Sequence, residues 1–273
     1  MRSFGRTNGY TSVMQFGLPA VSSPVPLPPF WREGRLPLEW AGLLRSDVLR
    51  GVGVPEGNGR GVLLIPGFLA GDGSLSTMTQ WLRAAGWWTK SAGIRANVNC
   101  SAAACGRIEE RLEELVRDTG DRAVIIGQSR GGVFAKALAS GRPDLVRGVV
   151  TLGSPLLSQL AVHPFVLAQI GMIGMVGAFA GGHALSWRCL RGECCAQFRA
   201  ALRDPFPSDV GFVSLYSRSD GVVDWHACLD PNAEWVEIDA SHCGMSLNAE
   251  AYRAVAAALR SFDTRDVGWP EAA

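Results

Sequence analysis

Two patterns of hydrophobic and polar residues alternate along the chain from about residue 60 to residue 262. Short apolar runs predict buried strands at 62–65, 123–126, 149–153, 211–216 and 235–238. Between them, apolar residues recur at helical spacing, in sets that include Leu75, Met78, Leu82 and Ala85, then Ile108, Leu112, Leu115 and Val116, and finally Tyr252, Val255, Leu259 and Phe262. Alternating β and α units of this kind predict an α/β fold, with a mostly parallel sheet flanked by helices on both faces.

The segment from about residue 155 to 205 departs from this alternation and is predicted to be a helical insertion. The chain of 273 residues, 47% of them hydrophobic, is long enough for one large core. We therefore expect a single domain over 51–273 that carries the insertion, preceded by an N-terminal extension over 1–50. Within the extension, the Ser/Pro-rich stretch 21–29 is predicted to be an extended tether, and 40–49 a short helix packed on the core.

Charge and hydropathy bear on binding to nucleic acid, on location and on membrane insertion. The formal net charge is +1 and no basic run occurs, so nucleic acid is not an expected partner. The first thirty residues lack the apolar core of a secretory signal, which leads us to expect a cytoplasmic location. Residues 166–181 carry no charge, but they fall short of the ~20 apolar residues of a membrane span and contain five glycines. No membrane span is expected.

A candidate nucleophile lies in the run Gly127-Gln128-Ser129-Arg130-Gly131, which directly follows the apolar strand 123–126. Glycines on both sides of a serine allow the close backbone approach of a tight strand-to-helix turn. The serine oxygen would then lie at the carboxyl edge of the sheet and beside a helix amino terminus, where developing negative charge is stabilised. The pattern is typical of a nucleophile elbow.

A serine hydroxyl needs a base, and the base needs an orienting acid. Of the four histidines, His242 follows a late predicted strand, whereas His163, His183 and His226 are expected to be packing or surface residues. The acid is expected at a strand end between Ser129 and His242. Asp220, in the turn after strand 211–216, is the preferred candidate, and Asp224 is the alternative.

The order Ser129, Asp220, His242 resembles that of the α/β-hydrolase superfamily, in particular its bacterial lipase and esterase branches. Four blocks carry the resemblance, at 62–68, 127–131, 219–223 and 241–245. The resemblance implies an oxyanion hole formed by the backbone amides of Phe68 and Arg130, and an insertion that caps the nucleophile. It implies no cofactor.

Two residues depart from the pattern of lipases. Gln128 stands before the nucleophile, where lipases usually carry histidine, and an arginine follows it. The Arg130 side chain has two interpretations: it meets an anionic head group or carboxylate of the substrate, or it forms a buried pair with Asp224 or another acid. The serine chemistry is compatible with both.

The insertion is expected to form the acyl pocket, with Met172 and Met175 as candidate lining residues, because methionine fills irregular apolar spaces. The alternative is a pair of helices that only covers the sheet. If the pocket interpretation holds, tryptophan at either methionine should shift the preference toward shorter acyl chains.

Seven cysteines are present and none has the C-x-x-C spacing of a zinc site. Cys189, Cys194 and Cys195 together with His183 can be combined into a metal site, but their spacing does not favour one, and no metal is expected. A disulfide in the insertion is compatible with an oxidising compartment, and thiols with a cytoplasm.

These features predict a serine hydrolase of small-molecule carboxylic esters or lipids, in which Ser129, His242 and Asp220 act through an acyl-enzyme. Two alternatives remain open: an acyltransferase with the same triad, and a non-catalytic lipid-binding protein on a hydrolase scaffold. Acyl length, head group and oligomeric state do not follow from the sequence.

Overall fold

A six-stranded parallel sheet forms the centre of the computed structural model, which describes residues 28–180, 185, 189 and 192–265. The tether predicted at 21–29 lies almost entirely outside the described residues. The strands follow the order β2-β1-β3-β4-β5-β6, and every neighbouring pair is parallel. Their bounds are β1 Gly61–Ile65, β2 Trp88–Ser91, β3 Ala123–Gln128, β4 Val146–Leu152, β5 Gly211–Tyr216 and β6 Glu234–Glu237.

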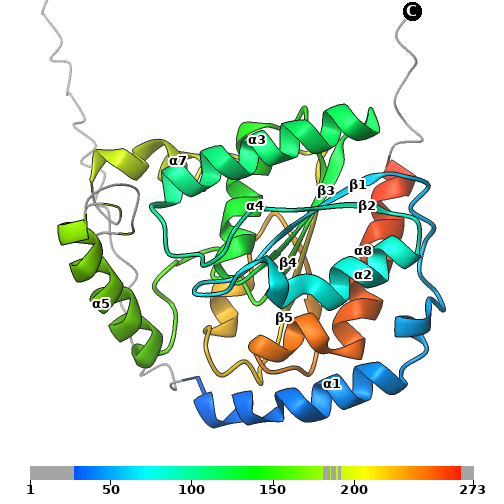
Figure 1. Cartoon of the computed structure of the whole chain (residues 1–273), viewed down its shortest axis with the longest axis horizontal. Coiled ribbons are helices and arrows are strands. Elements are labelled where there is room, and N and C mark those ends of the chain that lie inside the picture. The colour runs from blue at the N-terminus through cyan, green and yellow to red at the C-terminus, as the bar shows by residue number, and fades with distance from the viewer. Residues whose placement is uncertain (1–27, 181–184, 186–188, 190–191, 266–273) are drawn as a thin grey trace, which may run out of the picture.

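Helices cover both faces of the sheet, which confirms the predicted α/β class (Figure 1). Along β1, Val62 and Leu64 face one core and Leu63 and Ile65 face the other, because successive strand residues point to opposite faces. The first core includes residues of α1 Leu36–Arg45, α2 Ser76–Ala84 and α8 Ala249–Arg265. The second includes residues of α3 Ser101–Thr119, α4 Arg130–Gly141 and α7 Ala196–Ala201.

The helix ends follow the glycine pattern of the sequence. Gly120 caps α3 with a left-handed φ of 72°, and Gly86 follows α2 with a φ of 80°, a conformation that glycine adopts without strain. Short 3₁₀ segments connect several elements: η1 Phe30–Arg35, η2 Val48–Arg50, η3 Asp72–Leu75, η4 Glu193–Cys195, η5 Trp225–Cys228 and η6 Cys243–Leu247.

The insertion between β4 and β5 is helical, as predicted. Its main element is α5 Pro164–Ala180, which lies at the left edge of the view in Figure 1, apart from the helices that cover the sheet. None of the helices in the described part of the chain combines the length and hydropathy of a membrane span.

A buried ion pair ties α4 to the loop that follows η5. The Nζ of Lys136 lies 2.5 Å from Oδ2 of Asp230, and both side chains are almost fully inaccessible. Asp230 also accepts hydrogen bonds from the backbone and side-chain nitrogens of Asn232. The pair therefore joins the helix that follows Ser129 to the loop that precedes β6.

Candidate active site

Ser129 occupies a strained turn between β3 and α4. Its φ of 53° and ψ of −121° are unusual for a residue with a side chain, and its backbone N–H donates to the carbonyl of Leu152 at 2.8 Å. The flanking glycines make the turn possible: a Cβ at Gly127 would lie 2.5 Å from backbone atoms of Gly131, and one at Gly131 would lie 2.2 Å from the carbonyl oxygen of Ile65. A strained strand-to-helix turn flanked by glycines is the local geometry that a nucleophile elbow requires.

His242 and Asp220 form a buried pair next to this turn. Nδ1 of His242 lies 2.7 Å from Oδ2 of Asp220, and both residues are buried. The other carboxylate oxygen of Asp220 accepts the backbone N–H groups of Val222 and Val223 at 2.8 and 2.7 Å. The carboxylate is thus fixed on both sides and determines the orientation of the imidazole.

The alternative acid and the other described histidines lie elsewhere. Asp224 caps η5 and contacts His226 at 2.7 Å through its Oδ1. Nδ1 of His163 accepts the backbone N–H of Phe165 at the start of α5. His183 lies outside the described residues. The structure therefore brings Asp220, rather than Asp224, to His242.

Two glutamates from the N-terminal segment hold the loop of His242. In Glu33, one carboxylate oxygen accepts the N–H groups of Gly221 and His242, at 3.0 and 2.8 Å, and the other accepts that of Cys243 at 2.9 Å. Glu39, which is buried in α1, accepts both the N–H and the hydroxyl of Ser241. The sequence offered no motif for either residue, because their partners lie about 200 positions later in the chain.

The environment favours the protonated form of His242. Burial lowers the pKa of His242, but the charge and hydrogen bond of Asp220, with the charge of Glu33, outweigh burial and raise it above its ordinary value of 6.5. A raised pKa makes the imidazole a better proton acceptor, which suits a general base.

The two residues that flank Ser129 have structural partners. Nε2 of Gln128 donates to the backbone carbonyl of His242 at 3.2 Å. The guanidinium of Arg130 donates to the carbonyls of Asn97 and Asn99 and to the side chains of Asn97 and Ser101. Of the two interpretations of Arg130, the buried pair with Asp224 or another acid is not found among the hydrogen bonds of the guanidinium, and Asp224 contacts His226 instead. Burial lowers the pKa of Arg130 to about 10, and the nearby Cys100, Cys189 and Cys195 oppose that shift.

The predicted oxyanion residues lie beside the nucleophile. A Cβ at Gly67 would lie 3.2 Å from the Cβ of Ser129 and 3.8 Å from its Oγ, so the loop that carries Phe68 passes directly over the serine. Phe68 forms an isolated parallel bridge with Asn97. Arg130 is the first residue of α4, where backbone N–H groups lack partners within the helix.

A cavity of about 880 Å³ opens onto Ser129 and His242. Its walls are mostly apolar and come from the loop after β1, from the insertion and from the N-terminal segment, and they include Phe30, Phe68, Val133, Leu160, Val162, Phe165, Val166, Ile170, Leu185 and Phe198. Met172 and Met175 lie outside this lining and are 58% and 55% exposed, so their placement differs from the expectation. The residues of α5 that line the cavity are instead Phe165, Val166, Gln169 and Ile170.

Solved structures with the same arrangement of strands and helices are known. A lipase of Bacillus licheniformis in its mature form matches with a TM-score of 0.55 at 14% identity, over 75% of this chain and 93% of that one. A monoacylglycerol lipase of Paleococcus ferrophilus matches with a TM-score of 0.54 at 17% identity, over 77% and 96%. The chain has the α/β-hydrolase fold.

A third match carries that fold in its own name: the mouse α/β-hydrolase domain-containing protein 10, with a TM-score of 0.50 at 16% identity over 75% of this chain and 90% of that one. No protein-family model matches the sequence, and no curated protein matches it. The likeness to these structures is therefore a likeness of fold. At 14–17% sequence identity it does not establish the activity, which has to be inferred from the site itself.

Proposed function

We propose that the protein is a serine hydrolase of carboxylic esters. The observation that carries the proposal is that Ser129, on a strained elbow, and His242, bonded to the buried Asp220, face one apolar cavity. The names of the matched lipases support ester substrates at this coarse level.

In the proposed reaction, Oγ of Ser129 attacks the ester carbonyl while His242 accepts its proton. Asp220 keeps Nδ1 of the imidazole protonated and stabilises the imidazolium that forms. The tetrahedral oxyanion lies between the backbone N–H groups of Phe68 and Arg130, and one such donor contributes about 3–4 kcal/mol to catalysis. His242 then protonates the departing alcohol, and water hydrolyses the acyl-enzyme by the same steps.

The cavity suits an acyl chain. Its volume of about 880 Å³ and its apolar walls accommodate a hydrocarbon group larger than acetyl. Burial of each methylene contributes about 0.8 kcal/mol, so chain length is expected to govern kcat/KM. We therefore propose medium-length or longer acyl esters as substrates.

The test uses p-nitrophenyl esters of graded chain length together with a fluorophosphonate probe. Ser129→Ala is expected to stay folded and to lose both turnover and labelling, because alanine tolerates the same φ as serine. Ser158 also lines the cavity, is exposed, and provides a matched control: Ser158→Ala should retain labelling. If folded Ser129→Ala is still labelled, or if the wild type hydrolyses none of the esters, the proposal is wrong.

A further inference from the structure

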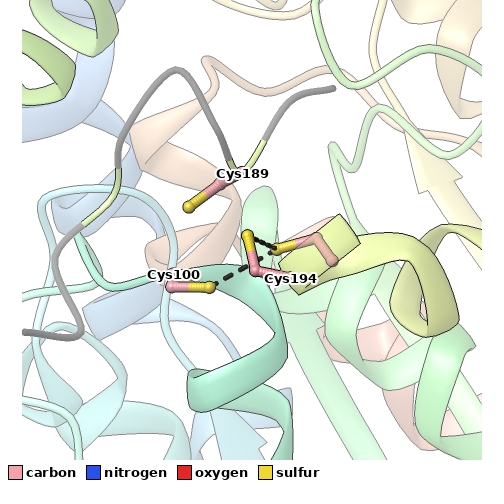
Figure 2. Close-up of side chains that lie close together, drawn as sticks. Cys100, Cys189 and Cys194 are labelled. Atoms are coloured by element: carbon pink, nitrogen blue, oxygen red, sulfur yellow. Dashed lines mark hydrogen bonds between the residues drawn. The ribbon is translucent and has the colours of Figure 1, made fainter. Parts of the chain in front are cut away.

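Four cysteines from separate parts of the chain meet beside the active-site cavity. Cys100 precedes α3, Cys189 belongs to the insertion, and Cys194 and Cys195 lie in η4. Their sulfur atoms all lie within 4.8 Å of one another. Figure 2 shows the side chains of Cys100, Cys189 and Cys194 gathered in one place. The Sγ atoms of Cys100 and Cys195 lie 3.4 Å apart, and those of Cys194 and Cys195 lie 3.8 Å apart.

The spacing of the sulfur atoms fits a single tetrahedral ion. With zinc–sulfur bonds of about 2.3 Å, the sulfurs of a Cys₄ site lie about 3.8 Å apart. An iron–sulfur cluster distributes its cysteines over separate iron atoms and needs a wider arrangement. A disulfide has a sulfur–sulfur distance of about 2.05 Å, which no described pair attains. Four tetrahedral thiolates are ligands of zinc or of iron–sulfur centres, and the close sulfur spacing favours a single zinc ion.

We propose that Cys100, Cys189, Cys194 and Cys195 bind one structural zinc ion. On binding, the four thiols release four protons and the ion with its thiolates carries a net charge of −2. Because four protein ligands complete the coordination, the ion has no open position for substrate, and its role is to join the insertion to the loop before α3.

The surroundings offset that negative charge. The Arg130 guanidinium lies within electrostatic range of Cys100, Cys189 and Cys195. Cys100 directly precedes α3, whose first backbone N–H groups have no partner within the helix and lie at the amino end beside the cluster. Such N–H groups and the positive helix terminus stabilise metal-bound thiolates.

Two arginines hold the segments that carry the cysteines. Arg130 binds the carbonyls of Asn97 and Asn99, in the loop that leads to Cys100. Arg199, on α7, binds the carbonyls of Cys189 and Gly192 at 3.0 and 2.7 Å. Both segments are thus fixed by hydrogen bonds that do not involve the sulfur atoms, which organises the cluster before an ion arrives.

The ion would stabilise one wall of the cavity. Cys189 lines the cavity, and Cys195 packs with Leu185 and Cys189 in an apolar cluster that also contacts Phe68. The spacing of Cys189, Cys194, Cys195 and His183 in the sequence did not favour a zinc site. Cys100 lies 95 positions before Cys195, too far away to form a sequence motif with it. His183 lies outside the described residues.

The test is metal analysis of the full-length protein, purified under reducing conditions from zinc-supplemented cells. We expect one zinc per chain by inductively coupled plasma mass spectrometry, and its loss in Cys100→Ser and Cys195→Ser. Cys105 lies on α3 but outside the cluster, so Cys105→Ser is the control variant and should keep its zinc.

Cobalt substitution of the wild type keeps the test independent of how the variants fold. Co²⁺ in four thiolates is expected to give a sulfur-to-metal charge-transfer band and intense tetrahedral d–d bands. Four results would overturn the proposal. They are no zinc in the wild type, zinc that persists in folded Cys100→Ser, a Cys100–Cys195 disulfide found by mass spectrometry of the alkylated protein, or iron together with inorganic sulfide.

Discussion

The carboxylate of Glu33 accepts the backbone N–H of His242 at 2.8 Å across 209 positions of sequence. The same carboxylate binds Gly221, next to Asp220, and therefore connects the loop of the proposed base with the loop of the proposed acid. Glu33 contacts no predicted reacting atom; it is a positioning residue.

Glu33→Gln should impair catalysis without unfolding the protein. Glutamine keeps only one accepting oxygen, so the loop of His242 loses part of its hydrogen bonding. A displacement of a catalytic group by about 1 Å lowers the rate on the order of 10²-fold. Because the charge of Glu33 also raises the pKa of His242, the acid limb of kcat/KM should move to lower pH. Glu250→Gln, which alters a carboxylate that binds the backbone of Asp239, is the matched control and should leave the limb in place.

Asp220→Asn should reduce kcat by about 10⁴-fold, because asparagine stabilises the wrong tautomer of the base. Asp224→Asn should have a small effect, since Asp224 contacts His226 on the surface. Steady-state kinetics on both variants, with circular dichroism as a check on folding, make the comparison. An equal loss in the two variants would contradict the role given to Asp220.

The pH dependence of the wild type follows from the raised pKa of His242. Only the neutral imidazole accepts the proton of Ser129, so kcat/KM should fall as the pH drops through the pKa of His242, with a midpoint above 6.5. Removal of the Asp220 charge should lower that midpoint, because the attraction that offsets burial is lost. A midpoint below 6.5 in the wild type would argue against this electrostatic picture.

Substitution of Val166 should change the acyl-chain preference, whereas substitution of Met172 should not. Both residues lie on α5, but Val166 lines the cavity and Met172 is exposed. Each methylene should raise kcat/KM roughly fourfold until the cavity is full. Val166→Trp should move that limit to shorter esters, whereas Met172→Trp should leave the profile unchanged from acetyl to palmitoyl. If Val166→Trp lowers kcat/KM equally for all chain lengths, the insertion only covers the sheet and does not select the acyl chain.

The two lysines of the chain should differ sharply in their contribution to stability. Lys136→Met leaves the carboxylate of Asp230 buried without its cation, which should cost about 3–5 kcal/mol. Lys90 pairs at the surface with Glu114 and Asp118, so Lys90→Met should cost about 0–1 kcal/mol. Urea denaturation measures both values. Similar midpoints for the two variants would show that Asp230 finds another partner or takes up a proton.

Periodicity predicted most of the fold because most elements are amphipathic or uniformly apolar. It missed β2, since Trp88–Ser91 is a short edge strand in which only Thr89 is buried. It also missed the inward face of α5, because a helix without charged residues has no polar face that tells one side from the other. Met172 and Met175 were therefore indistinguishable in sequence from residues such as Val166.

Local sequence motifs predicted those residues of the candidate site that lie in a short motif or directly after a strand. Ser129 sits in its five-residue run, and Asp220 and His242 each follow a strand end. Glu33, Glu39 and Cys100 were not predicted, because each acquires its role from a partner that only the folded chain brings near. Hydrogen bonds and thiol clusters between distant parts of the chain produce no recognisable pattern in the sequence.

The bond between Glu33 and His242 also sets the order in which a newly made chain becomes competent. Synthesis releases the nucleophile elbow complete with its strand and helix while the segment that contains His242 is still untranslated. Glu33, made earlier still, gains its bonds to Gly221, His242 and Cys243 only after the segments that follow β5 and β6 have been made. Contacts between such distant segments form late because loop closure must precede them. If Ser129 acts as proposed, the nascent elbow is catalytically silent, and hydrolysis is expected only once the early and late parts of the chain have joined.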